Sequence, residues 1–221
     1  MTTISHYLYY MIPISAAIAF LASLTVFFIP GGEPFLKAFS FFLLVNACFD
    51  TATSYMALHD IQNVFIGNVN TLVVISYYLF LLRHIVRGKK ARAGILISLI
   101  IFLLLSFTNF FLAKKIDTFI SITYCLGSLL IVAASVYFFW ELFQRTYSGP
   151  LGRQPAFWIC SGLLFYYTCT FPVYGATNLI KALPNVIREN LLVILVSLNI
   201  LLYLSFVIAF LCRIKTRKSM S

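Results

Sequence analysis

The chain has 221 residues, of which 62% are hydrophobic and only 10% are charged, and its mean hydropathy is +0.97. A water-soluble domain of this length does not need so much apolar surface, so the composition excludes an ordinary soluble protein. The formal net charge is +10. We expect these basic residues to set the membrane topology and to contact anionic lipid head groups, and we do not expect nucleic acid as a partner.

Mostly apolar segments follow one another along the chain, and each is long enough, at roughly 20 residues, to cross a hydrocarbon core of about 30 Å as a helix. None of them shows the period-two alternation of a transmembrane β-strand. The sequence therefore predicts an all-α membrane protein in which residues 1–221 form a single seven-helix transmembrane domain. The expected helices are 8–29, 35–58, 62–85, 93–113, 117–142, 155–180 and 189–211, and residues 212–221 form a short basic cytoplasmic tail.

Basic residues mark one side of the predicted bundle. If the N-terminus lies outside, twelve of the sixteen Lys and Arg residues fall on the cytoplasmic side and four fall outside. All the loops are short, and under this condition the positive-inside rule predicts that the N-terminus lies outside and the C-terminus lies in the cytoplasm. We expect the membrane to be the plasma membrane, which is the inner membrane of a bacterium. The twelve residues are Lys37, Arg83, Arg87, Lys89, Lys90, Arg92, Arg145, Arg153, Arg213, Lys215, Arg217 and Lys218.

The second predicted helix contains a carboxylate within the membrane. The stretch "FFLLVNACFDTATSYMALHD", residues 41–60, places Asn46 near the midplane and Asp50 about 6 Å further toward the outer side. An unpaired carboxylate at this depth costs about 2.5–3.5 kcal/mol, so Asp50 should face protein or water and not lipid. Asn46, Asp50 and Ser54 follow at intervals of four residues, so we expect them to share one inward face.

Two other predicted helices carry amides at matching depth. In the third helix Asn63, Asn70 and Tyr77 follow at intervals of seven along one stripe, and in the seventh Asn199 lies near the centre with Tyr203 one turn deeper. Amides in membrane bundles also join helices without binding a ligand, at about 0.6 kcal/mol each. That interpretation stays open for Asn70 and Asn199.

The sixth predicted helix adds hydroxyl groups, because Tyr167, Thr170 and Tyr174 climb one face from the middle toward the outer surface. We expect Asp50 to lie within about 8 Å, directly or through a water, of a polar side chain from the third, sixth or seventh helix. Asn70, Tyr167, Tyr174 and Asn199 are the expected neighbours. The predicted ligand-binding residues are Asn46, Asp50, Asn70, Tyr167, Thr170, Tyr174 and Asn199.

The inner half of the predicted bundle contains hydroxyl groups but no amide or carboxylate before Glu141, near the cytoplasmic boundary. Arg145 follows one turn later, and we expect these two residues to form an interfacial ion pair. A conduit would need polar walls on both sides, so the asymmetry predicts a pocket that is open outward and closed inward. Pro172 removes a backbone hydrogen bond, and we expect it to kink the sixth helix beside the polar stripe.

Residues typical of membrane enzymes and pigments are missing. The seventh segment has no lysine for a retinal Schiff base, and no core His or Lys is available as the base of a serine dyad or triad. Zinc hydrolases need several buried His or carboxylate ligands. His6, His59 and Asp60 fall instead at the outer boundary, where we expect interfacial polar residues. The sequence therefore predicts no enzyme, no cofactor and no metal site.

The stretch "FWICSGLLFYYTCTFP", residues 157–172, follows a short basic loop. In this order of features, over most of the chain, the sequence resembles small seven-helix membrane proteins of bacteria that have no established activity. It is more distantly similar to the seven-helix sensory portions of bacterial receptor histidine kinases. The chain has no kinase domain, so this resemblance implies signalling through a separate cytoplasmic protein.

Two functions fit these features. The first is a receptor-like sensory protein, in which a small molecule or lipid enters the outer pocket and the change passes to a cytoplasmic partner. The second is a small transporter that uses Asp50 as a proton or cation site. The one-sided polarity favours the first function.

Overall fold

The structure is a computed structural model that describes residues 3–28, 34–59, 61–112, 121–144, 151–176 and 184–218. Over these ranges it contains seven α-helices, two short 3-10 helices and no β-strand. All seven α-helices contain a stretch long and apolar enough to cross a membrane, so the predicted seven-helix fold of a multi-pass membrane protein is confirmed. The elements are α1 (Thr3–Ser23), η1 (Leu24–Phe28), α2 (Pro34–Leu58), α3 (Val64–Ile85), α4 (Lys89–Leu112), α5 (Ser121–Phe143), η2 (Leu151–Arg153), α6 (Pro155–Gly175) and α8 (Asn185–Lys218).

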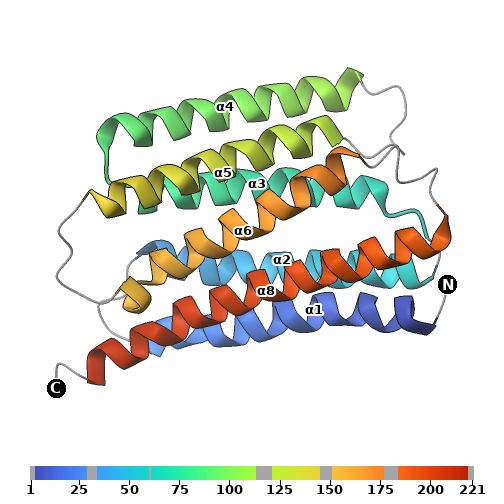
Figure 1. The fold of residues 1–221 in the computed structure, drawn as a ribbon, viewed down its shortest axis with the longest axis horizontal. Helices are drawn as coiled ribbons and strands as arrows, with labels where there is room; N and C mark the ends of the chain where they lie inside the picture. Colours follow the sequence, from blue (N-terminus) through green and yellow to red (C-terminus); the bar gives the residue numbers. More distant parts are fainter. Residues whose placement is uncertain are drawn as a thin grey trace.

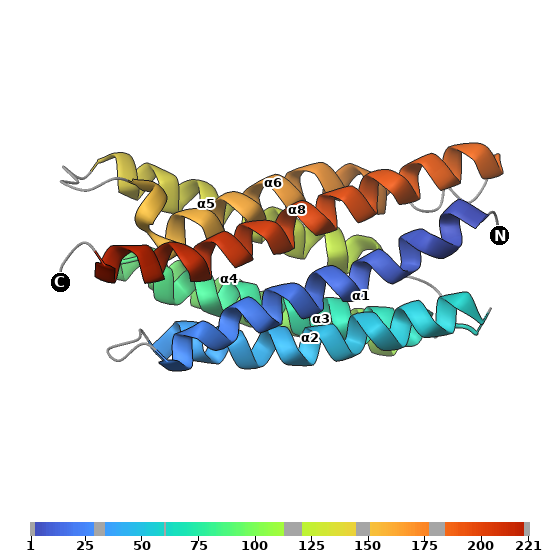
Figure 2. The ribbon, with the colours of Figure 1, turned by 90° about the horizontal axis from the view of Figure 1, so that it is seen from below.

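Six of the helices form a closed ring of contacts. The two termini lie at opposite ends of the bundle (Figure 1). Going round the ring, α1 contacts α2, α2 contacts α3, α3 contacts α5, α5 contacts α6, α6 contacts α8, and α8 returns to α1. α4 lies outside the ring, against α3 and α5 (Figures 1 and 2). The predicted polar residues sit on α2, α3, α6 and α8, so the ring places their helices around a common centre.

The observed helices overlap the predicted ones, and two differences at their ends matter. α6 ends at Gly175, and the backbone N–H of Ala176 bonds to the carbonyl of Pro172. Residues 177–180 of the predicted helix lie outside the described residues. Pro172 lies inside α6 but in its last turn and not in mid-helix, and the expected kink stays a prediction. α8 continues to Lys218, so residues 212–218 of the predicted tail are helical.

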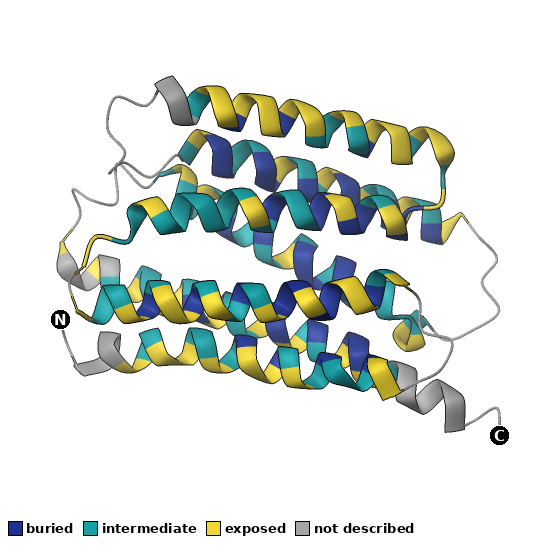
Figure 3. Ribbon diagram, turned by 180° about the vertical axis from the view of Figure 1, so that it is seen from behind, coloured by how far each residue is buried: buried dark blue, intermediate teal, exposed yellow. Residues whose placement is uncertain are grey.

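The outer surface of the bundle is apolar, as contact with lipid requires. Exposed positions follow the outer sides of the helices and are most continuous along α4 (Figure 3). They include the large side chains of Ile97, Ile100 and Leu104. One side of α4 therefore packs against α3 and α5, and its other side exposes apolar side chains that suit contact with lipid.

α6 and α8 approach each other closely at Gly162. A Cβ atom at this position would overlap the Ser205 hydroxyl oxygen and lie 2.9 Å from the Ser205 Cβ. Small residues at helix interfaces in membranes let two backbones approach in this way. Gly162 therefore fixes α6 against α8 about midway along both helices.

The end of the bundle opposite the N-terminus has an aromatic core. Phe39 and Phe42 of α2, Tyr77 of α3, and Phe206 and Phe210 of α8 contact one another, and we call these five residues the aromatic plug. The Phe42 and Tyr77 rings stack with centroids 3.9 Å apart, and the Phe39 ring lies 4.9 Å from Phe206 and 5.6 Å from Phe210. Phe39, Phe206 and Phe210 are fully buried, so this end of the core is filled.

Glu141 lies at the same end of the bundle. Arg145 falls outside the described residues, so the expected ion pair stays a prediction. The Glu141 carboxylate accepts a hydrogen bond from the backbone N–H of Arg87, with 3.0 Å between Oε2 and N. This bond ties α5 to the turn between α3 and α4.

Candidate functional site

A cavity of about 330 Å³ lies in the centre of the helix ring. Residues from α1, α2, α3, α5, α6 and α8 line it. Thr53, Asn63 and Tyr174 are among them, so the cavity extends from the centre toward the end where α2 finishes, α3 begins and the N-terminus lies. Its volume falls within the range of about 300–1,000 Å³ that is usual for small-molecule sites.

The α2 wall of the cavity is polar. Asn46, Asp50 and Ser54 are 5%, 9% and 6% exposed, which confirms that they share an inward face. Their spacing of four residues produces this face, because a helix turns about once every 3.6 residues. Asn46 and Asp50 line the cavity, and Ser54 does not.

The Asp50 carboxylate is held by a hydroxyl group from α8. The Tyr203 hydroxyl donates a hydrogen bond to Asp50 Oδ2 over 2.6 Å. The Asn46 amide nitrogen donates to the Tyr203 hydroxyl and, over 3.4 Å, to the same Asp50 oxygen. All three side chains are buried, so the network joins α2 to α8 in the core. Tyr203 was not among the expected partners of Asp50.

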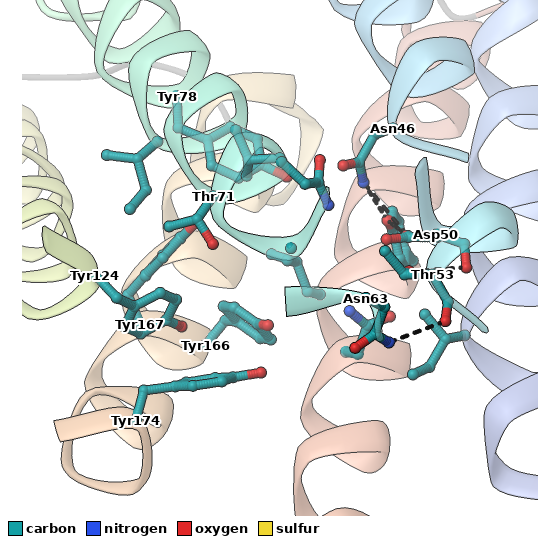
Figure 4. A pocket seen from close by; sticks show the side chains of 18 of the residues that line it. Asn46, Asp50, Thr53, Asn63, Thr71, Tyr78, Tyr124, Tyr166, Tyr167 and Tyr174 are labelled. Carbon is teal, nitrogen blue, oxygen red and sulfur yellow. Dashed lines mark hydrogen bonds between the residues drawn. The ribbon is translucent and has the colours of Figure 1, made fainter. Parts of the chain in front are cut away.

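The α3 wall contributes Asn70, Thr71 and Tyr78. At the end of the cavity nearer the N-terminus, Asn63 donates a hydrogen bond to the backbone carbonyl of Thr53 over 3.2 Å (Figure 4). Gly67 also lines the cavity, and a Cβ atom placed there would meet no atom within 4 Å. The absence of a side chain at Gly67 therefore leaves open space beside the cavity.

Tyrosine rings from α5 and α6 form the wall opposite Asn46 and Asp50 (Figure 4). The Tyr124 and Tyr174 rings lie 4.3 Å apart, the Tyr166 and Tyr167 rings 5.2 Å apart, and Tyr124 lies 6.2 Å from Tyr167. These contacts hold the rings in fixed positions. One wall of the cavity thus carries a carboxyl and an amide group, and the facing wall consists of aromatic rings.

Three amide oxygens at the cavity have no hydrogen-bond partner. They are the Oδ1 atoms of Asn46, Asn70 and Asn199, and each atom is buried. A buried acceptor left without a partner costs about 1–3 kcal/mol, so such atoms are rare in native proteins. Three of them around one cavity leave acceptor positions there for hydrogen-bond donors, including water.

Six of the seven predicted ligand-binding residues line the cavity, and the seventh does not. Thr170 is fully buried behind the wall. Its hydroxyl donates to the backbone carbonyl of Tyr166 over 2.9 Å and accepts from the Tyr124 hydroxyl over 2.8 Å. Thr170 therefore positions Tyr124 and does not contact the cavity.

Several lining residues were not among the predicted ligand-binding residues, although Asn63 and Tyr203 had been noted on the polar faces of their helices. They are Thr53, Asn63, Thr71, Tyr78, Tyr124, Tyr166 and Tyr203. Tyr203 had a detectable signal, because it follows Asn199 by four residues and therefore shares its face of the helix. Tyr166 precedes a predicted residue by one position, and only the packing of α6 decides that both rings reach the cavity. No comparable signal exists for Tyr124.

Within the described residues, no group of three or more His, Cys, Asp and Glu side chains is placed to hold a metal ion. Asp60 and the side chain of His6 lie outside that part of the structure. Asp50 is the only carboxylate among the residues that line the cavity.

No protein-family model, no curated protein and no solved structure matches this chain. Its fold and cavity define its class, which is a multi-pass seven-helix membrane protein with a polar, tyrosine-rich central cavity.

Proposed function

We propose that the protein is a receptor-like sensory membrane protein, which binds a small molecule in the central cavity and signals to a separate cytoplasmic protein. One observation carries this proposal. The cavity extends from the middle of the bundle toward the end where the N-terminus lies, and the aromatic plug fills the core at the other end. A cavity that is closed at one end suits a receptor.

The orientation belongs to the same proposal. Arg83, Arg87, Lys89 and Arg92 lie at the end of the bundle that holds the aromatic plug, so the positive-inside rule places this end in the cytoplasm. The cavity then faces the outside of a bacterial plasma membrane. A ligand would reach it without crossing the lipid bilayer.

α8 is the element through which we expect the signal to pass. Asn199 and Tyr203 contribute to the cavity, Phe206 and Phe210 belong to the aromatic plug, and the helix continues without a break to Lys218. A ligand that displaces Tyr203 from Asp50 would shift α8, and a rigid helix carries such a shift to its cytoplasmic end.

A small transporter is the second candidate, and Asp50 is the observation that favours it, because intramembrane carboxylates often bind transported ions. Transport would require the aromatic plug to open in each cycle. The plug contains three fully buried rings, and two of them, Phe206 and Phe210, pack against the third, Phe39, so the receptor is the better supported function.

Mass spectrometry of small molecules that co-purify with the protein tests the proposal. Gly67→Leu places a side chain in the open space beside the cavity, and Gly94→Leu places the same side chain on the exposed surface of α4. We expect a compound that is retained by the wild type and by Gly94→Leu and is lost from Gly67→Leu. Equal retention by both variants would contradict binding in this cavity.

A further inference from the structure

We infer that the ligand of this cavity is a small organic cation, whose ammonium group binds beside Asp50 and whose apolar part packs against the tyrosine rings. This inference rests on the proposed function, because it names the ligand class of the same cavity. The charge, the hydrogen-bonding groups and the size of the cavity each support it.

Asp50 is the group that can give the cavity a negative charge. Among the described residues that line the cavity, Asp50 is the one acidic residue, and none is Lys, Arg or His. Both hydrogen bonds to the carboxylate reach Oδ2, and Oδ1 accepts none from the described residues. A buried carboxylate without a counter-charge is costly, so a cation beside Oδ1 would lower the free energy and an anion would raise it.

The hydrogen-bonding groups also call for a donor. The Oδ1 atoms of Asn46, Asn70 and Asn199 are buried acceptors without partners. An ammonium group carries three N–H donors and no acceptor. It therefore offers donors to Asp50 and to such an amide oxygen, whereas a carboxylate or a fully ionised phosphate offers none.

The facing wall suits the remainder of such a ligand. Tyr124, Tyr166, Tyr167 and Tyr174 present aromatic rings opposite Asp50 (Figure 4). Aromatic faces attract cations and also bury apolar groups. The cavity of about 330 Å³ is far larger than a single metal ion needs, so we assign an organic cation and not an inorganic one.

Charge-selective labelling of an introduced cysteine tests this inference without knowledge of the natural ligand. Thr71→Cys puts a thiol on the cavity wall, and Ile61→Cys puts a control thiol on the exposed turn at the same end of the bundle. Each variant reacts with 2-aminoethyl methanethiosulfonate, which is a cation, and with 2-sulfonatoethyl methanethiosulfonate, which is an anion. The wild-type protein supplies the background from its five native cysteines.

We expect the ratio of the cation rate to the anion rate to be at least about tenfold higher at residue 71 than at residue 61, because a single buried charge nearby favours one reagent and repels the other. Adding Asp50→Asn should bring the ratio at residue 71 to within about threefold of the control, and adding Asp50→Glu should keep it high. Equal ratios at the two positions, or a preference for the anion at residue 71, would overturn the inference. If the Asp50→Asn protein does not fold, the inference is tested by comparing the ratios at residues 71 and 61 in proteins that keep Asp50.

Protection of the Thr71→Cys thiol separates the kinds of cation. We expect 2-phenylethylammonium to protect the thiol at concentrations at least about tenfold lower than neutral 2-phenylethanol, because loss of a charge-assisted hydrogen bond weakens binding by about that factor. Protection by sodium chloride alone, by both organic compounds equally, or by neither would overturn the assignment of an organic cation.

The same experiment distinguishes this inference from the proposed function on which it rests. If the thiol at residue 71 reacts with both reagents at similar rates, the cavity is accessible but does not prefer cations. This result would overturn the inference and leave the proposed function standing. A thiol that reacts with neither reagent, while residue 61 reacts normally, would overturn both.

Discussion

Removal of the Tyr203 hydroxyl should destabilise the bundle by about 2 kcal/mol. Tyr203→Phe keeps the ring, which is 3% exposed, and so creates no large cavity. It deletes the 2.6 Å bond to Asp50 and the bond accepted from Asn46. A hydrogen bond to a charged group contributes about 1.5–3 kcal/mol, whereas neutral ones in membrane bundles average about 0.6 kcal/mol.

The free energy of unfolding, measured by titrating sodium dodecyl sulfate into mixed micelles, checks this value. Tyr7→Phe is the matched control, because Tyr7 is 65% exposed and should lose less than about 0.5 kcal/mol. In a background of Asp50→Ala, Tyr203→Phe should cost at least about 1 kcal/mol less than in the wild type, because its main partner is gone. Equal costs in the two backgrounds would refute the network.

Three further predictions concern packing and orientation. Gly162→Ala should lower the free energy of unfolding by about 1–3 kcal/mol, because the new methyl group overlaps Ser205. Adding Ser205→Gly should restore most of this loss. A thermal unfolding midpoint that the second substitution does not restore would contradict the contact. Thr170→Val should cost about 1 kcal/mol in the same assay through the lost hydroxyl bond, and an unchanged midpoint would count against it. In intact cells, an impermeant thiol reagent should label a cysteine at Asn185 and miss one at Lys89, and the reverse pattern would invert the proposed orientation.

The number of helices could be predicted from the sequence because the thickness of the hydrocarbon core sets a minimum length for each apolar run. The inward position of Asp50 followed from the cost of a carboxylate in lipid, which is larger than most packing preferences. The same physics applies to any bundle, so these predictions did not require knowledge of how the helices are arranged.

The detailed lining of the cavity depends on helix rotation, which the spacing of residues fixes only loosely. Asn63 and Asn70 reach the cavity, but Tyr77 stacks on Phe42 in the aromatic plug, and Tyr78 lines the cavity in its place. An interval of seven residues falls about 20° short of two full turns, so a stripe drifts away from the face on which it began.

The distinction between the cavity wall and the layer behind it was also invisible in the sequence. Thr170 lies between Tyr167 and Tyr174 on one face of α6, and the spacing predicts equally that each of the three lines the cavity. In the structure Tyr124 of α5 covers Thr170 and bonds to its hydroxyl. A contact between helices far apart in the sequence decides this, and no periodicity within α6 contains it.

An experimental structure of the protein purified from its native membrane tests the central claim, that the cavity binds a small molecule beside Asp50, most directly. We predict density that does not belong to the chain between Asp50 and the Tyr174 ring, with one atom within about 3 Å of Asp50 Oδ1. The Asp50 carboxylate turned toward lipid, or the cavity filled by the protein's own side chains, would contradict the claim.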